Sequence, residues 1–194
     1  MAHELEIMEN GEASMAYVGE VPWHGLGKRV PADLSPEQML KAANLDWTVQ
    51  KVPLFYNVES GPVMTNARAL VRSTDQKLLT VVSEAWKPVQ NIEAFEFFND
   101  FVQAGDMEMH TAGSLRDGKM VWAMAQIKES FELFGGDKVD GYLLFRQHHY
   151  LFFSCCQFCH VVYLPSLRFI LLVILQAVIL SIFRISSQAD FLHV

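Results

Sequence analysis

The sequence predicts an α+β domain with a mainly antiparallel sheet and a few helices. Pairs of apolar runs flank short polar turns, two stretches have helical spacing with cap residues, and strands do not alternate regularly with helices. A chain of 194 residues is long enough for one domain with a substantial core, and we do not expect two full domains.

A loop and a helix are predicted first. Residues 17–31 combine Pro, Gly, Trp and His without a sustained period, which is typical of an ordered loop. Ser35 can cap a helix that has Pro36 at its first position and Gln38 three residues after the cap, so the helix should end near Asn44.

Strands are predicted next. Residues 47–58 are rich in β-branched and aromatic side chains, but Pro53 cannot donate to a central ladder and should break the run. Residues 67–83 contain two apolar runs around the polar tetrad 73–76, which predicts an antiparallel hairpin.

The second half begins with an expected amphipathic helix. Asn91 is the predicted cap and Gly105 the terminator, with Phe95, Phe98 and Val102 on one buried face.

More strands should follow this helix. Asp117 and Gly118 lie between two runs, of which residues 120–127 are apolar enough for a central strand. Residues 138–145 predict another strand after the turn at Gly135 and Gly136.

Charge divides the chain unequally. Residues 1–145 hold 21 acidic and 12 basic residues, whereas residues 146–194 hold one and three. The acidic part argues against broad, charge-driven affinity for nucleic acid and leaves room for a local basic groove. The N-terminus carries four glutamates and no apolar run, so we expect no secretory signal and a cytoplasmic location.

The stretch 146–194 differs sharply in composition, since it lacks Gly, Lys, Glu, Asn, Thr and Met. One interpretation is a membrane segment at residues 161–183, although its uncharged part, 169–183, is short for a bilayer. A second is a metal or haem site, because Cys156, Cys159 and His160 form a C-x-x-C-H pattern, but neighbouring turn residues are missing. The third, which we favour on composition, is a shifted reading frame or a fused coding stretch.

Several motifs resemble the phage/plasmid-like protein family, catalogued as domain of unknown function 932. They are "AHELE", "ASMAYVGEVPWHGLGKRV", "VSEAWKPVQNIEAFEFFNDF", "TAGSLRDGKMVWAMAQI" and "GDKVDGYLLF". The resemblance covers about residues 1–145, and the chain departs from the family at Arg146. It implies a protein encoded by phages, plasmids and the bacterial genomes that carry them, with no established enzymatic activity. It also implies truncation, because family members continue with polar sequence.

The most site-like stretch is "WHGLGK". Its glycines could let the backbone approach a ligand and its lysine could contact a phosphate, while the alternative is a structural loop whose tryptophan anchors into the core. The ligand-binding candidates are Trp23, His24, Gly25, Gly27 and Lys28.

A groove for single-stranded nucleic acid is a further candidate. Two arginines four apart on a strand should face one side, a turn adds two more cations, and tryptophans could stack with bases. The alternative is a solvated charged face. The candidates are Arg68, Arg72, Trp86, Arg116 and Lys119.

Catalysis is not favoured, because no metal-binding or paired-carboxylate spacing ties the histidines and acids together, and no cofactor is expected. The leading hypothesis is a non-enzymatic accessory in the nucleic-acid transactions of a mobile element, with single- or double-stranded DNA as partner. The alternatives are a tail-anchored membrane protein and a truncated or frameshifted product without function.

Overall fold

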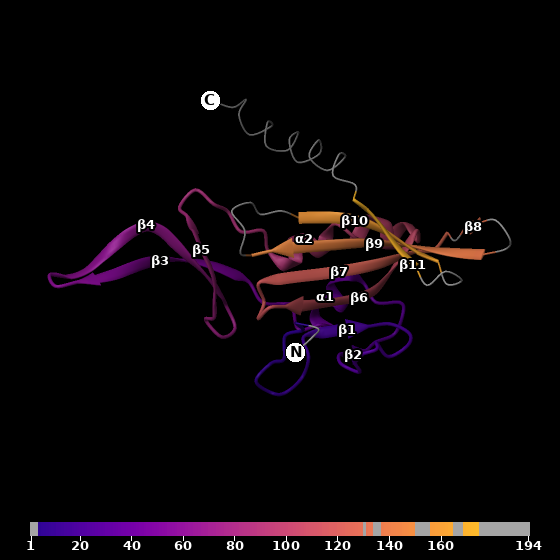
Figure 1. Cartoon of the computed structure of the whole chain (residues 1–194), viewed down its shortest axis with the longest axis horizontal. Helices are drawn as coiled ribbons and strands as arrows, with labels where there is room; N and C mark the ends of the chain where they lie inside the picture. The colour runs from indigo at the N-terminus through magenta and orange to yellow at the C-terminus, as the bar shows by residue number, and fades with distance from the viewer. Residues whose placement is uncertain (1–3, 130, 134–136, 150–155, 165–168, 175–194) are drawn as a thin grey trace, which may run out of the picture.

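The structure is a computed structural model that describes residues 4–129, 131–133, 137–149, 156–164 and 169–174, with side chains described for 4–129 and 140–149. It confirms the predicted α+β class with a mainly antiparallel sheet (Figure 1).

The larger sheet forms the body of the molecule. Its strands lie in the order β11-β10-β9-β7-β6-β1-β2, with β8 paired to β9, and every pairing is antiparallel except that of β1 with β2. The strands are β1 (Met15–Tyr17), β2 (Lys28–Arg29), β6 (Met107–Leu115), β7 (Met120–Ile127), β8 (Phe131–Leu133), β9 (Asp137–His148), β10 (Cys156–Leu164) and β11 (Phe169–Ile174).

A second sheet of three strands carries a long hairpin that projects from the body (Figure 1). It consists of β3 (Val49–Val58), β4 (Gly61–Arg72) and β5 (Leu78–Ser83), in the order β3-β4-β5. The predicted hairpin around residues 73–76 is confirmed. The predicted break at Pro53 is wrong, because β3 is an edge strand and its register shifts between Pro53 and Phe55, so the missing donor is tolerated.

Three short helices cover one face of the larger sheet: α1 (Pro36–Ala42), α2 (Asn91–Glu96) and α3 (Asn99–Ala104). The predicted capping box of α1 is confirmed, since Ser35 Oγ accepts from Gln38 N at 3.2 Å and Gln38 Oε1 accepts from Ser35 N at 2.8 Å. The helix predicted from residue 91 to Gly105 ends at Gly105 as expected, at φ 84°, but it is divided into α2 and α3.

Asn91 is not the cap of α2. Gln90 holds that position, and its backbone N–H donates to the Glu93 carboxylate at 2.9 Å. The Asn91 side chain is buried instead and donates to Leu45 O at 2.9 Å, so it ties α2 to the chain that follows α1. A buried amide needs hydrogen-bond partners, and Leu45 O supplies one of them.

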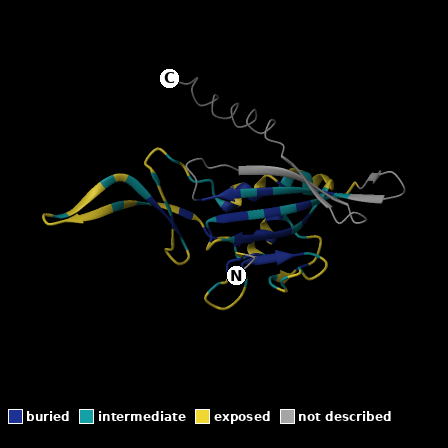
Figure 2. Cartoon of the chain, in the orientation of Figure 1, coloured by how far each residue is buried: buried dark blue, intermediate teal, exposed yellow. Residues whose placement is uncertain are grey.

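The main core lies between the helices and the sheet. Phe95 and Phe98, which were predicted to be buried, are fully enclosed, and the Phe98 ring meets that of Phe145 from β9 edge to face at 6.5 Å. Ala123 and Ala125 of β7 give these rings room against the sheet. Each buried phenylalanine contributes about 1.5–3 kcal/mol through burial. Burial is deepest in this body, whereas the projecting hairpin is largely exposed (Figure 2).

The predicted boundary at residue 145 lies inside β9. Arg146, Gln147 and His148 continue the β9 ladder, opposite Trp122, Val121 and Met120 of β7. The chain thus remains part of the sheet at the point where its composition changes.

The predicted membrane segment at 161–183 is described only in part. Residues 161–164 and 169–174 lie in β10 and β11, and the rest of the segment is outside the described residues. Within the described part of the chain, no helix has the length and apolar character needed to cross a membrane.

Candidate functional site

Arg72 joins the hairpin sheet to the body. At the end of β4, its guanidinium donates to Glu6 Oε1 from Nη1 at 2.6 Å and to both carboxylate oxygens of Asp75, at 2.9 and 2.6 Å. Its guanidinium carbon also lies 5.4 Å from the centre of the Trp47 ring. Arg72 and Glu6 are only 8% and 4% exposed. The hydrogen bonds from Arg72 lower the pKa of Asp75 to about 2.

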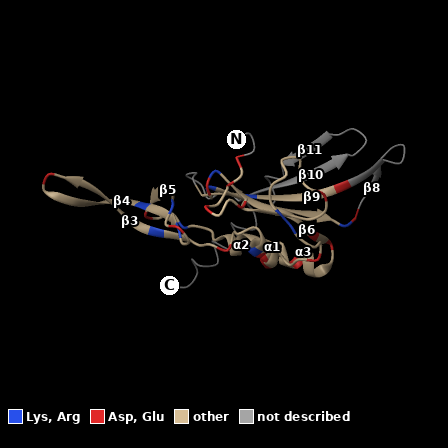
Figure 3. Ribbon diagram, turned by 90° about the horizontal axis from the view of Figure 1, so that it is seen from below, with Lys and Arg blue, Asp and Glu red and all other residues tan. Residues whose placement is uncertain are grey.

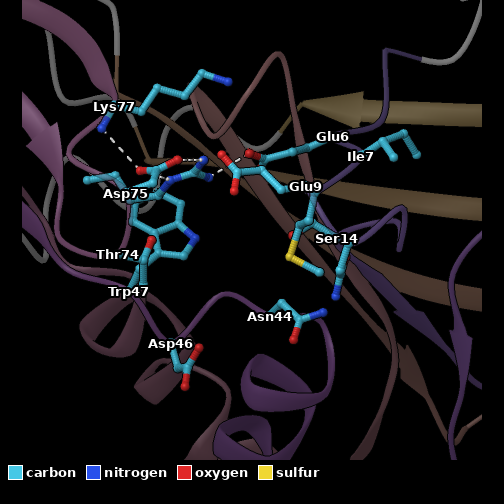
Figure 4. Close-up of a pocket in the computed structure, with 13 residues that line it drawn as sticks. Glu6, Ile7, Glu9, Ser14, Asn44, Asp46, Trp47, Thr74, Asp75 and Lys77 are labelled. Atoms are coloured by element: carbon cyan, nitrogen blue, oxygen red, sulfur yellow. Dashed lines mark hydrogen bonds and ion pairs between the residues drawn. The ribbon is translucent and has the colours of Figure 1, made fainter.

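A cavity of about 630 Å³ lies beside this junction. In Figure 4, Glu6, Glu9 and Ser14 form one wall, Trp47, Thr74 and Asp75 form the other, and Asn44 and Asp46 lie at one end. Four carboxylates and two cations line it: Glu6, Glu9, Asp46 and Asp75 against Arg72 and Lys77. We call this cavity the junction pocket.

A second hollow, of about 380 Å³, lies on the face of the sheet opposite the helices. Val121 and Ala123 of β7 and Phe145 of β9 pack into the helical core, so the alternating residues Trp122 and Arg146 face the other way. The Trp122 ring lies over Gly113, which has no side chain. A Cβ at this position would lie 3.1 Å from the indole, so the glycine leaves the space that the ring occupies. The hollow is lined by Leu5, Met15, Trp23, His24, Leu115, Met120, Trp122, Leu144 and Arg146. We call it the tryptophan hollow.

The predicted loop forms the rim of the tryptophan hollow. Trp23 is 83% exposed, so the alternative in which it anchors into the core is wrong. Gly25 and Gly27 have φ of 68° and 101°, a region that disfavours side chains. His24 Nδ1 accepts a hydrogen bond from Leu26 N at 3.1 Å, which holds the turn and places the Trp23 and His24 rings 5.3 Å apart. The loop therefore presents an indole to solvent on a fixed backbone.

Lys28 lies apart from this rim. It is exposed at the start of β2, opposite Ala16 of β1, and it lines a separate hollow with Gly25 and Gly27. The structure therefore brings Trp23 and His24 into one hollow and places Lys28 in another.

The predicted nucleic-acid groove is not assembled as expected. Arg72 is buried between two carboxylates, so the expectation that it lines an open groove is wrong. Arg68 pairs with Glu84, and Arg116 pairs with Glu4 at 2.7 Å. Trp86 packs against the main core, and Lys119 is half-buried, with its backbone carbonyl accepting from His149 N. These ion pairs neutralise arginines that were predicted to contact phosphates.

The helical layer is acidic. Residues 32–46 and 90–106 hold seven acidic residues and one lysine, a net charge of −6. Figure 3 shows the acidic positions of α1, α2 and α3 on the side of the sheet away from the N-terminal segment. The N-terminal segment is acidic as well, since residues 4–20 hold five glutamates and no lysine or arginine.

Among the described residues, His149 is a fully buried titratable group beside the core. Its Nε2 lies 3.2 Å from Asn91 Oδ1, and its ring centre is 5.5 Å from that of Trp47. Burial, with a smaller contribution from His148, lowers the pKa of His149 to about 4. The ring is thus neutral at physiological pH and acts as part of the core.

Metal binding finds no support in the described part of the chain, where no three His, Cys, Asp or Glu side chains converge on one point. The weak metal candidates Cys156, Cys159 and His160 belong to β10, and their side chains lie outside those described.

Sequence reasoning missed most of the residues that line these two hollows. Glu6 and Trp47 of the junction pocket are separated from Arg72 by 66 and 25 positions, and no local pattern links them. Arg146 was set aside as the first residue of a foreign tail. The paired register of β7 and β9, which sequence alone does not give, brings it next to Trp122.

The fold and these hollows define an α+β protein with an open aromatic sheet face and a buried ionic junction. The family described as Domain of unknown function (DUF932) matches residues 78–150, so the predicted resemblance is confirmed over that range and extends five residues past the predicted limit. No curated protein and no solved structure matches the chain.

Proposed function

We propose that the protein binds single-stranded nucleic acid at the tryptophan hollow, as an accessory in the nucleic-acid transactions of a mobile element. The observation that carries the proposal is an indole 83% exposed at the rim of a hollow that also contains a second indole and a guanidinium. Bases stack on exposed aromatic rings without regard to sequence, and arginine can add a cation–π contact. The mobile-element context rests on the resemblance alone.

The chemistry of the hollow favours stacking over phosphate binding. Its lining contains Met15, Leu115 and Met120 beside the tryptophans, and Arg146 is its one formally charged member. A binding mode that depends on phosphates would need several clustered cations, whereas a stacked base needs an apolar platform. The turn at Gly25 and Gly27 supports this role, because it places the Trp23 ring at the rim of the hollow, where a base can reach it.

The test is fluorescence anisotropy with a labelled 20-nucleotide oligo-dT and the full-length chain in about 50 mM salt. Trp23→Ala should weaken binding by about 5- to 150-fold, since one stacked base contributes about 1–3 kcal/mol. Phe55→Ala is the matched control, because Phe55 is an exposed aromatic residue, 55% accessible, on the projecting hairpin. No binding by the native chain, or equal losses in both variants, would refute the proposal.

A further inference from the structure

The projecting hairpin of β3 and β4 exposes apolar side chains on both of its faces. Phe55 and Met64 lie opposite each other in the two strands and are 55% and 56% exposed. Tyr56 and Val63, the next pair along, point to the other face and are 52% and 38% exposed. The hairpin stands away from the body and is exposed along most of its length (Figure 2). Four exposed apolar side chains in one short hairpin indicate an interaction surface.

The backbone of β3 also has an open edge. Within the described chain, β4 is the one strand that pairs with β3, so β3 is an outer strand of its sheet. An outer edge is a template for another strand, and charged residues and prolines usually protect it. Between Lys51 and Glu59 this edge carries no charge and one proline. Residues 61–66 of β4 extend beyond the pairing with β5, but they carry no charge that could fix a register.

The charges at the two ends of the β3 edge are complementary to those of a second copy. Lys51 and Glu59 each lie four positions from Phe55, so antiparallel pairing about a two-fold axis at Phe55 places each lysine opposite a glutamate. Both charged residues are exposed, and neither forms an ion pair within the described chain. Lys51 Nζ donates to the carbonyls of Glu84 and Trp86 at 2.7 and 3.2 Å, which leaves the third ammonium proton for a carboxylate.

We propose that the protein forms a two-fold symmetric dimer by antiparallel pairing of β3 with β3 of a second copy, centred on Phe55. This register places the two Phe55 rings opposite each other and Leu54 opposite Tyr56, and such cross-strand pairs stabilise a sheet. Pro53 lies opposite Asn57, so the ladder lacks at most the bonds that the two prolines cannot donate. The assembly closes at two copies, because each copy contributes the same edge.

The geometry of the hairpin permits this pairing and predicts a weak dimer. Residues 51–59 span about 27 Å at about 3.4 Å per residue, so the two bodies lie at opposite ends of the paired strands. These nine residues are fewer than the roughly 20–30 that each partner contributes to a standard interface. We therefore expect a reversible dimer with a dissociation constant of about 10–100 μM.

The test is sedimentation velocity of the full-length chain from about 1 to 300 μM. Nucleic acid is absent, so the result does not depend on the proposed function. Lys51→Glu and Glu59→Lys should each weaken the dimer about tenfold, because each substitution places like charges opposite each other at both ends.

An equimolar mixture of these two variants should restore native dimerisation, because every charge pair between them is of opposite sign. The double variant Lys51→Glu/Glu59→Lys should also dimerise like the native chain. These two measurements separate charge pairing from any effect of one substitution on folding.

A further variant locates the interface at β3. Phe55→Lys places two ammonium groups opposite each other at the axis, and should weaken the dimer by more than about tenfold. Val81→Lys is the matched control, because Val81 is an apolar residue, 46% exposed, on the opposite edge strand β5. This variant should dimerise like the native chain.

Three results would overturn the proposal. They are a native chain that stays monomeric up to about 300 μM, single charge variants that dimerise as tightly as the native chain, and a mixture that dimerises no better than either variant alone. Equal weakening by Phe55→Lys and Val81→Lys would also overturn it, since the interface would then not be the β3 edge.

Discussion

Arg72→Met should destabilise the folded chain far more than an ordinary ion-pair deletion. The substitution keeps an apolar stem of similar length but leaves the Glu6 carboxylate, which is 4% exposed, without its donor. Removing one partner of a buried pair costs about 3–5 kcal/mol, because the remaining charge is neither paired nor hydrated. Asp75 adds little to this loss, since its side chain is 36% exposed and water can replace the guanidinium.

The measurement is the free energy of unfolding from urea titration followed by tryptophan fluorescence. Arg68→Met is the matched control, because Arg68 is also on β4 and pairs with a glutamate, but Glu84 is 65% exposed. We expect a loss of at most about 1 kcal/mol for that variant. The double variant Glu6→Gln/Arg72→Met should recover much of the loss, because it leaves no buried charge.

Equal losses of unfolding free energy in Arg72→Met and Arg68→Met would contradict this prediction. So would a Glu6→Gln/Arg72→Met variant that is no more stable than Arg72→Met, since the uncompensated Glu6 carboxylate would then not be the cause of the loss.

Two further predictions concern the core and the sheet. Lowering the pH from 6.5 to 4 should reduce the free energy of unfolding by about 3 kcal/mol through His149. In the unfolded chain this histidine binds a proton near pH 6.5, whereas in the folded chain its pKa is about 4 and the ring stays neutral over this range. His149→Gln should flatten this part of the stability curve, and an unchanged slope would contradict the assignment. Gly113→Ala should lower the free energy of unfolding by about 1–3 kcal/mol, because the new Cβ would lie 2.9 Å from Ser14 O and 3.1 Å from the Trp122 ring. Urea titration measures this loss, and a variant as stable as the native chain would show that β1 can shift at no energetic cost.

Local chemistry explains which elements the sequence predicted well. The capping box at Ser35 and the terminating glycine at Gly105 act within a few residues, so their patterns are visible in a single segment. The same is true of the hairpin around residues 73–76. The effect of Pro53 was predicted wrongly, because a strand can contain proline when it lies at the edge of a sheet. Whether a strand lies at an edge is known only once the sheet is assembled.

The candidate sites depended on long-range pairing and were predicted only in part. Trp23 was identified from its loop, but its neighbours Trp122 and Arg146 come together through the register of β7 and β9. Arg72 was predicted to line a nucleic-acid groove, and this prediction is wrong because its guanidinium pairs with Glu6, which is 66 residues away. A charged residue at the end of an apolar strand can signal a buried ion pair as well as an exposed face.

The negative charge of the chain sets a limit on how nucleic acid can bind at the tryptophan hollow. The acidic residues of the helices are separated from the opposite face of the sheet by about the diameter of a helix, roughly 10 Å. This separation exceeds the Debye length, which is about 8 Å at 0.15 M salt. Salt therefore screens their repulsion, and the one cation in the lining, Arg146, releases few counterions. Affinity for oligo-dT should change with salt by a logarithmic slope of about −1 or shallower, since single strands give about −0.7 for each neutralised phosphate. A slope steeper than about −3 would require several phosphate contacts and would place the binding surface elsewhere on the chain.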